Sequence, residues 1–372
     1  MKTVFYVKRQ KTFFLISFLV VLMSSFFVNG QEKETSIQLV DSIYSKELKQ
    51  YRKFTTYLPK TYSVPHNRKH EYPIIYVLDG DKRKDLVNTI YQFLADNKRP
   101  MILEAIIVAI HQMDRSYELT PNKGTHFFNG TLIPSTMNMG GGDSFYAFMK
   151  NELNPEIQKR YRANNFVNLV GHSFGGLFAL HIMQKNDDFI KGIVAIDPSL
   201  WWNNGYLVDD CKKYLENNNT TKPILFLAEA GPKEDNLHSK SIEKFSEIIK
   251  SNTTQMPNSK FRFYKDKNHY TVLIPAIQDG LTFLLEDQTF RHLDSRMTKE
   301  YIIDSFKKKS KMALVDIQPS NTRIVTYGDL CMIKKMPEHA LEFYNWAIEN
   351  GVPKNILNKK IEKSKALISS KD

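Results

Sequence analysis

A short glycine-rich segment, Gly171-His172-Ser173-Phe174-Gly175, holds the residue types of a serine nucleophile. It follows the apolar run FVNLV directly and opens the helical run GLFALHIM, so Ser173 is predicted to lie on a turn between a strand and a helix. The flanking glycines permit the sharp turn that exposes such a hydroxyl. A glycine-rich turn with a capping serine is the alternative. In this strand–turn–helix setting the segment predicts a nucleophile elbow.

A serine hydroxyl becomes an effective nucleophile only when a base removes its proton. His269 stands in the segment KDKNHYT, between the last predicted strand and the helix expected after it. That is where the base belongs in the chain order serine, acid, histidine. His181 lies within the elbow's own helix, and His238 precedes a helix in a polar loop, whereas His292 and His339 belong to the C-terminal tail. The sequence therefore favours His269 as general base over a surface-loop role.

The acid of such a triad is expected after the strand that ends near Ala228, in the segment LAEAGPKEDN. Glu229 is expected to lie still at the strand end. Glu234, three residues past Gly231, is the preferred acid and Asp235 the alternative. A Ser–His dyad among solvated loop acids is the remaining possibility.

A developing oxyanion needs two N–H donors. One is expected from the backbone of Phe174, the residue after the nucleophile. The second is expected from the backbone of Asp81, in the loop where Gly80 and Asp81 follow the first buried strand. An ordinary Asp-Gly turn is the alternative at that position.

The elements that must position these residues alternate along the chain. Short apolar or β-branched runs predict strands, and segments with helical spacing follow most of them, which indicates βαβ units and a mostly parallel sheet flanked by helices. We therefore expect an α/β body over residues 35–288 and a helical extension over 291–372. The predicted strands are 37–44, 51–58, 73–78, 102–110, 166–170, 192–196, 224–228 and 260–264. The predicted helices of the body are 86–94, 144–161, one from about 175, 239–249 and 272–285.

Composition excludes several classes of protein. The 42% hydrophobic and 25% charged residues are ordinary globular usage. The net charge of +12 lies mostly in the first residues and the tail, so it predicts solvated surface charge and no nucleic-acid partner. Cys211 and Cys331 lack the spacing of a zinc site, and two unpaired thiols are favoured over one bridge.

The N-terminus has the plan of a signal peptide. Basic residues precede the uncharged run from Phe13 to Val28, which is too short to span a membrane easily, and small residues follow before Gln31. Residues 1–30 are therefore predicted to be a cleaved leader, and the protein to be exported to the periplasm or the medium. An uncleaved membrane anchor is the alternative.

Several stretches together resemble the esterase D-like branch of the α/β-hydrolases, and their motifs are most similar to those of siderophore esterases. The resemblance covers about residues 37–288, and the stretches that carry it are TTYLPKTY, IIYVLDGD, DRSYELTP, VGHSFGGLFAL and AIDPSLWW. It implies an α/β-hydrolase fold and a serine esterase without metal or cofactor. The G-x-x-E turn from Gly231 to Glu234 is similar to that of the siderophore-esterase subgroup and adds weight to Glu234. The leader and the helical tail depart from the family pattern.

The same resemblance implies a substrate that is a small-molecule or polysaccharide-linked ester. Siderophore lactones, feruloyl or acetyl polysaccharides and simple acyl esters all fit one elbow. Trp201 and Trp202 are expected to line an acyl or aromatic pocket, with core packing as the alternative, and Arg115 is expected to border the site. Acyl transfer to a sugar hydroxyl and a non-catalytic binding protein on a hydrolase scaffold are the alternative functions.

The tail contains one further pattern. Its apolar residues between Ala340 and Ala347, with Pro353 beyond Gly351, are similar to the second helix of a tetratricopeptide repeat. A preceding helix at about 324–334 would complete one unit. One repeat cannot bury its own apolar face, so the tail is expected to pack on the body or, alternatively, to bind a protein partner.

Overall fold

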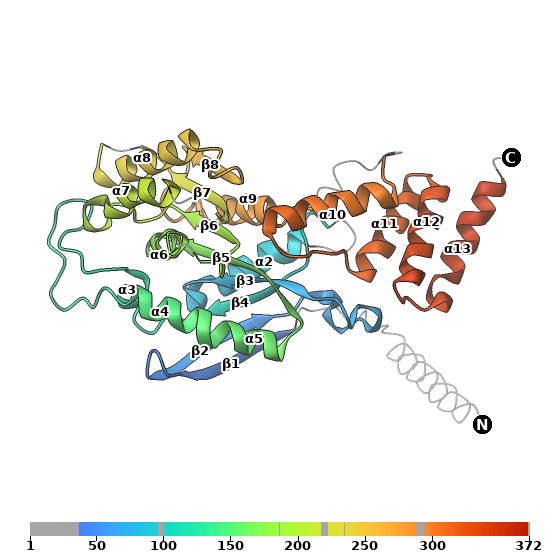
Figure 1. Cartoon of the computed structure of the whole chain (residues 1–372), viewed down its shortest axis with the longest axis horizontal. Helices are drawn as coiled ribbons and strands as arrows, with labels where there is room; N and C mark the ends of the chain where they lie inside the picture. Colours follow the sequence, from blue (N-terminus) through green and yellow to red (C-terminus); the bar gives the residue numbers. More distant parts are fainter. Residues whose placement is uncertain are drawn as a thin grey trace, which may run out of the picture. The chain divides into compact units, whose positions relative to one another are not determined.

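The computed structural model (Figure 1) describes residues 37–95, 100–185, 187–216, 222–233, 235–287, 294 and 296–370. The predicted leader lies outside the described residues. Among the helices that the described residues form, none combines the length and the apolar composition needed to cross a bilayer.

Eight strands form one sheet in the order β1-β2-β4-β3-β5-β6-β7-β8. The pairs β1–β2 and β2–β4 are antiparallel, and all other neighbours are parallel. The strands are β1 (Gln38–Ser45), β2 (Gln50–Tyr57), β3 (Tyr72–Val77), β4 (Ile106–Ile110), β5 (Ala163–His172), β6 (Gly192–Ile196), β7 (Ile224–Ala230) and β8 (Ser259–Tyr264). The sheet is the mostly parallel α/β sheet that the sequence predicts.

The predicted strands are all present, with changed ends in several cases. Strand β6 has the predicted bounds, whereas β5 is longer at both ends than the predicted 166–170. Strand β4 is shorter than the predicted 102–110, because Ile102 leaves the sheet to form an isolated bridge with Glu286.

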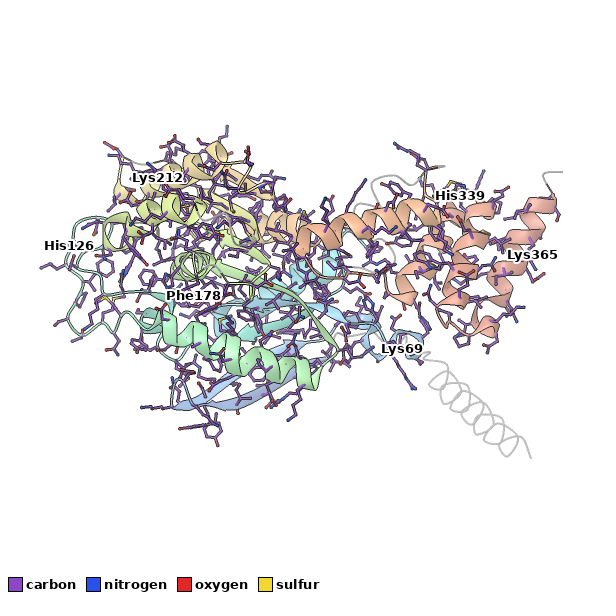
Figure 2. All side chains as sticks on the ribbon, viewed as in Figure 1. Lys69, His126, Phe178, Lys212, His339 and Lys365 are labelled. Atoms are coloured by element: carbon purple, nitrogen blue, oxygen red, sulfur yellow. The ribbon has the colours of Figure 1, made fainter. Side chains whose placement is uncertain are left out.

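Helices cover both faces of the sheet (Figure 1). Successive residues of a strand point to opposite faces, so Ile74 and Tyr76 of β3 enter one apolar core and Ile75 and Val77 the other. The first core also receives α6, whose Phe178 (Figure 2) is fully buried. The helices of the body are α2 (Gly80–Leu94), α3 (Arg115–Leu119), α4 (Gly142–Phe148), the π-helical turn η3 (Met149–Leu153), α5 (Asn154–Arg160), α6 (Phe174–Met183), α7 (Trp202–Glu216), α8 (Leu237–Ser251) and α9 (Leu273–Leu285). Short 3-10 turns η1 (Lys60–Ser63) and η2 (Pro65–Asn67) precede β3.

Two helical segments differ from the sequence prediction. The single helix expected over 144–161 is α4 and α5 joined by the π-helical turn η3. Helix α7 was not predicted. Near its start the backbone is left-handed at three successive residues, Asn203, Asn204 and Gly205. Because of this interruption the segment lacks a continuous helical pattern in the sequence.

The tail consists of α10 (Lys299–Ala313), α11 (Asn321–Ile333), α12 (Pro337–Glu349) and α13 (Lys354–Ser369). Helices α11 and α12 coincide closely with the two helical segments predicted in the tail. It contacts the body through buried polar groups. Arg323 of α11 donates to the carbonyl oxygen of Ile102 at 2.8 Å, and the Tyr327 hydroxyl donates to Asp287 at 2.7 Å. Its apolar residues join the core on the α2 and α9 side of the sheet.

Candidate active site

Ser173 occupies the turn between β5 and α6, as the sequence predicts. Its backbone has φ 61° and ψ −116°, a strained conformation for a residue other than glycine. The turn is tight, because a Cβ atom on Gly171 would lie only 2.2 Å from the carbonyl oxygen of Gly175. The half-buried Ser173 therefore stands at the carboxyl end of β5, on a strained and tightly packed turn.

The neighbouring strand holds this turn in place. The Ser173 N–H donates to the Ile196 carbonyl at 3.0 Å, and the Ser199 N–H donates to the Ser173 carbonyl at 3.1 Å. The two serine hydroxyl oxygens lie 3.3 Å apart, within hydrogen-bond reach. Ser199 is thus a site residue that the sequence analysis did not single out, although it belongs to the quoted stretch AIDPSLWW.

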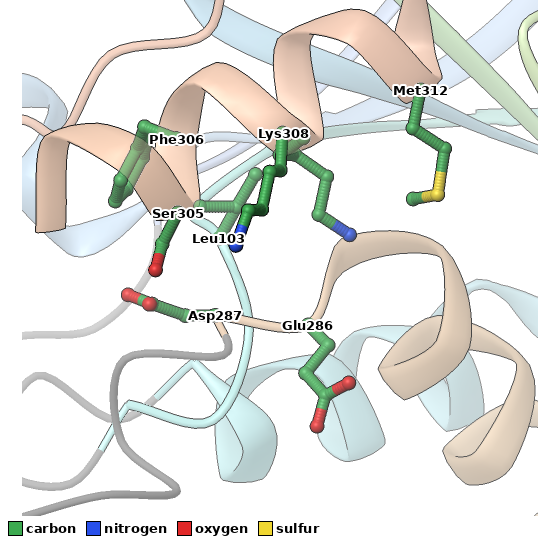
Figure 3. Close-up of a pocket in the computed structure, with 8 residues that line it drawn as sticks. Leu103, Glu286, Asp287, Ser305, Phe306, Lys308 and Met312 are labelled. Carbon is green, nitrogen blue, oxygen red and sulfur yellow. The ribbon is translucent and has the colours of Figure 1, made fainter. Parts of the chain in front are cut away.

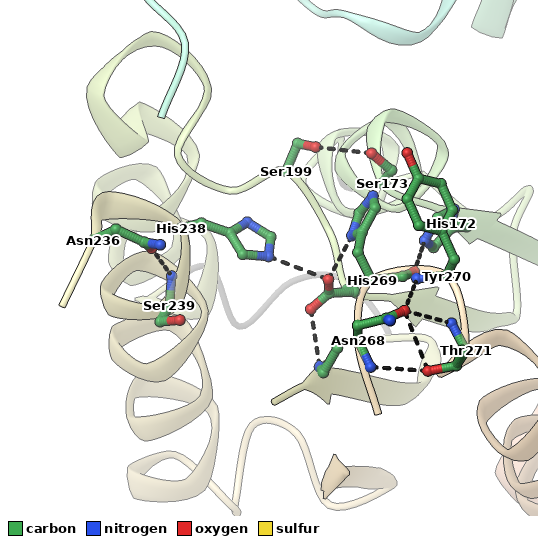
Figure 4. Close-up of polar contacts among 12 residues, drawn as sticks. His172, Ser173, Ser199, Asn236, His238, Ser239, Asn268, His269, Tyr270 and Thr271 are labelled. Atoms are coloured by element: carbon green, nitrogen blue, oxygen red, sulfur yellow. Dashed lines mark hydrogen bonds and ion pairs between the residues drawn. The ribbon is translucent and has the colours of Figure 1, made fainter. Parts of the chain in front are cut away.

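The His269 ring lies next to Ser173 (Figure 4). Its Nδ1 atom is 2.6 Å from Oδ2 of Asp197. An ionised carboxylate only accepts hydrogen bonds, so Nδ1 carries the hydrogen and the neutral ring keeps its lone pair on Nε2. This is the tautomer that a general base for Ser173 requires.

Asp197 is buried directly after β6. Its Oδ1 accepts the N–H of Ala230 at 2.9 Å, and its Oδ2 accepts from His269 and, at 3.2 Å, from His238. Burial alone would raise the pKa of Asp197, but the hydrogen bonds from His238, His269 and the Ala230 backbone hold that pKa well below its usual range. The carboxylate is therefore ionised at neutral pH.

The carboxylate that contacts His269 differs from the predicted one. Glu234 lies outside the described residues. Asp235 is exposed and pairs with Lys240, and Glu229 is buried at the end of β7, where the sequence places it. Strands β6 and β7 are parallel neighbours, with Ile196 opposite Ala228, so an acid after either strand reaches the same edge of the sheet.

The loop that carries His269 is anchored on both sides. The His172 ring donates from Nε2 to the His269 carbonyl at 2.7 Å, and burial lowers the pKa of His172 to about 3, so the ring is neutral. The Asn268 side chain accepts the N–H groups of Tyr270 and Thr271, each at 3.0 Å (Figure 4). These bonds fix the backbone from which the His269 ring extends.

The predicted oxyanion donors both lie at helix starts. Phe174 is the first residue of α6 and Asp81 the second residue of α2, and the first N–H groups of a helix have no acceptor within it. The residue before α2, Asp79, has left-handed backbone with φ 54°, and one of its carboxylate oxygens would lie 3.8 Å from a Cβ placed on Gly175. The start of α2 therefore lies beside the elbow.

Arg115 borders this site, but its guanidinium is already engaged. It binds both oxygens of Asp79, at 2.6 and 3.0 Å, and donates to the His172 carbonyl at 3.3 Å. It also lies over the Phe174 ring, 5.4 Å from the ring centre. Arg115 thus ties the start of α2 to the elbow, which is a structural task that the sequence analysis did not foresee.

The two tryptophans have different surroundings. Trp202 is fully buried, stacks edge-on against Phe174 with ring centres 5.1 Å apart, and donates from Nε1 to the Asn122 carbonyl at 3.2 Å. It packs beneath the elbow with none of its surface exposed, which is the core packing given as the alternative for this ring. Trp201 is also buried, with 6% of its surface exposed, and packs against Phe127 and Phe128 from the loop before α4.

Asp197, His238 and His269 bring ligand atoms within 4.8 Å of one another, and their residue types also bind divalent metals. In the observed arrangement both imidazoles address the same carboxylate oxygen as hydrogen-bond donors. These two hydrogen bonds to Asp197 account for the clustering of the three side chains.

A cavity of about 140 Å³ lies between the end of α9, the residues after it and α10 (Figure 3). Neither Ser173 nor His269 lines it. Burial lowers the pKa of its Lys309 to about 8, and the ammonium donates to the Leu284 carbonyl at 3.0 Å. The cavity lies on the tail side of the body and is not part of the candidate active site.

Comparison with known proteins supports an esterase assignment. The model of the Esterase family, described as "Putative esterase", matches residues 45–300. The siderophore enterobactin esterase of Emericella nidulans is 25% identical over 253 residues, which are 56% of this chain and 81% of the relative. The ferri-bacillibactin esterase BesA of Bacillus subtilis is 23% identical over 240 residues, 58% of this chain and 79% of the relative.

Among solved structures, an IroE-like serine hydrolase from Shewanella oneidensis has the same fold, with a TM-score of 0.75 and 24% identity. The likeness covers 84% of this chain and 99% of that one. Residues 1–287 alone make up less than 84% of the chain. The aligned region must therefore include part of the helical tail. Because the Esterase family model matches residues 45–300, the chain belongs to the Esterase family. Its fold is that of the α/β-hydrolases.

Proposed function

We propose that this protein is a serine esterase that hydrolyses a carboxylic ester through an acyl-enzyme on Ser173. The observation that carries the proposal is the 2.6 Å hydrogen bond from His269 to Asp197, in a ring that lies next to the strained serine. It selects the His269 tautomer whose free Nε2 atom can take the serine proton.

In the first half of the reaction the Ser173 oxygen attacks the ester carbonyl carbon while His269 takes the hydroxyl proton. The carbonyl oxygen becomes an oxyanion, which the N–H groups of Phe174 and Asp81 stabilise. The C–O bond to the alcohol then breaks, and His269 returns the proton to the leaving oxygen. Asp197 stabilises the imidazolium between these two transfers.

In the second half a water molecule gives a proton to His269 and attacks the acyl carbon. The bond to Ser173 breaks, the serine regains the proton and the carboxylic acid leaves. The same groups therefore serve both halves, and the elbow needs no rearrangement between them.

We propose a siderophore ester as the substrate. The two curated relatives are esterases of enterobactin and of ferri-bacillibactin by name. The aromatic side chains of Phe127, Phe128 and Trp201 near the elbow are compatible with an aromatic acyl group. Export through the predicted leader would place the enzyme where such compounds enter a cell.

The test is hydrolysis of p-nitrophenyl acetate by the full chain, with Ser173→Ala as the paired variant. We expect activity in the wild type and a loss of at least about a thousandfold in the variant. A fluorophosphonate probe should label the wild type only. A catecholate trilactone and a feruloyl ester, compared by kcat/KM, then test the substrate. Equal rates of wild type and variant would overturn the proposal.

A further inference from the structure

His238 contacts the same carboxylate as the proposed base. It is the second residue of α8, and its Nε2 atom lies 3.2 Å from Oδ2 of Asp197, the oxygen that also accepts from His269. The two imidazole rings are nearly perpendicular, with centres 6.0 Å apart. Figure 4 shows His238 approaching from the side of α8, away from Ser173.

The direction of this hydrogen bond follows from the charge of the acceptor. Because Asp197 is ionised, the nitrogen that faces it must carry a hydrogen, so His238 donates from Nε2. The other nitrogen of His238, Nδ1, is buried and has no hydrogen-bond partner among the described residues. The bond to Asp197 is therefore the polar contact that holds this ring in a partly buried place.

From this arrangement we propose that His238 is a positioning residue of the esterase reaction, acting through Asp197. The inference rests on the proposed function and adds a fourth member to its triad. The Ala230 N–H donates to Oδ1 of Asp197, and His238 donates to Oδ2, the oxygen that also accepts from His269. These two donors fix the plane of the carboxylate toward His269.

The second donor also has an electrostatic effect. A hydrogen bond from His238 withdraws part of the Asp197 charge, so the imidazolium of His269 is stabilised less. Loss of this donor should leave more negative charge on Asp197, which favours the protonated state of the Ser173–His269–Asp197 group. The acid limb of the kcat/KM profile should consequently move to higher pH.

Other charged groups act on the same cluster. Asp197 faces His238 from the end of β6, and His269 faces it from the loop after β8. The buried Glu229 lies near them on β7. Burial raises the pKa of Glu229 to about 7, against the opposing charge of Lys233. The ionisation of Glu229 therefore falls within the pH range of the activity profile and must be separated from the effect of His238.

The test compares His238→Phe, which keeps a ring but has no donor, with His238→Gln, which keeps an N–H. Activity toward p-nitrophenyl acetate is measured from pH 5 to 9, in the wild-type and in the Glu229→Gln background. The matched control is His339→Phe, because His339 also lies in the first turn of a helix, α12, and also has a buried Nδ1 without a partner among the described residues.

For His238→Phe we expect kcat to fall about tenfold with KM within about twofold, and the acid limb to rise by about half a pH unit in both backgrounds. His238→Gln should keep most of kcat, and His339→Phe should match the wild type. If His238→Phe does not fold, His238→Leu repeats the test.

A wild-type profile in folded His238→Phe would overturn the inference. Equal losses in the Phe and Gln variants without a shift of the acid limb would also overturn it, because they indicate packing alone. Failure of the proposed function is distinct, since Ser173→Ala would then remain active.

Discussion

Asp197 and His269 are 72 positions apart in the chain, yet the His269 Nδ1 atom lies 2.6 Å from the Asp197 Oδ2 atom. Asp197 comes directly after β6, and His269 stands in the loop between β8 and α9. Both loops leave the carboxyl edge of the parallel strands, where the elbow also lies. The bond therefore connects the proposed base to an acid on the strand next to the elbow.

Replacing Asp197 with Asn should nearly abolish esterase activity. The amide has no charge to stabilise the imidazolium, and its NH₂ group can select the wrong tautomer of His269, so we expect kcat to fall by about a thousandfold or more. Activity toward p-nitrophenyl acetate at pH 7.5 measures the effect. Asp235→Asn, at the exposed alternative acid, is the control and should retain wild-type kcat. The opposite ranking of these two variants would refute Asp197 as the triad acid.

Stability should fall as the pH is lowered below about 6.5. Burial lowers the pKa of His172 to about 3 and that of His70 to about 4, so the unfolded chain binds these protons at a pH where the folded protein does not. Each histidine should cost about 1.4 kcal/mol of unfolding free energy per pH unit below 6.5, down to its folded pKa.

Urea unfolding at pH 7.5, 6.0 and 5.0 measures this dependence. His172→Asn should flatten the slope, whereas the same change at His126, which is exposed on a loop, should leave the slope as in the wild type. An unchanged slope in His172→Asn would contradict the assignment.

The Gly171→Ala substitution should destabilise the fold. The added methyl group would meet the Gly175 carbonyl oxygen at 2.2 Å, so β5 or α6 must shift, which should cost about 2–3 kcal/mol of unfolding free energy. Gly175→Ala is the matched control, because its nearest contact is Leu78 at 3.5 Å, an ordinary distance. Chemical denaturation of both variants checks the prediction, and equal stabilities would count against a tight elbow.

Removing the Arg323 guanidinium should weaken the attachment of the tail to the body. Arg323 is buried, lies 3.5 Å from the buried Asp287 carboxylate and donates to the Ile102 carbonyl. Arg323→Met would leave a buried carboxylate without this cation, so we expect a loss of about 3–5 kcal/mol. Urea unfolding measures it. Arg296→Met, in an exposed pair with Asp294, should leave the midpoint unchanged, and an equal effect of both variants would argue against a structural role for Arg323.

The sequence by itself determined the features that depend on local pattern and chain order. The elbow at Ser173 is readable because an apolar strand, a glycine-flanked serine and a helical run are contiguous. The position of His269 follows from the alternation of strands and helices, which also predicts the parallel sheet. The central strands β3, β4 and β6 are readable because a strand that is buried on both faces is an almost uninterrupted apolar run. The outer strands β1 and β8 are more exposed and are readable from their β-branched and aromatic residues.

Only the tertiary structure decided which acid meets His269. Carboxylates follow or end both β6 and β7, and either position agrees with the chain order serine, acid, histidine. Because these strands are parallel neighbours, both carboxylates lie at the same edge of the sheet. There it is Asp197 that hydrogen-bonds to His269. The structure likewise decided that Trp202 is buried and that His238 shares the Asp197 oxygen. These contacts join residues from separate βα units, and their distances depend on how the units pack rather than on any local pattern.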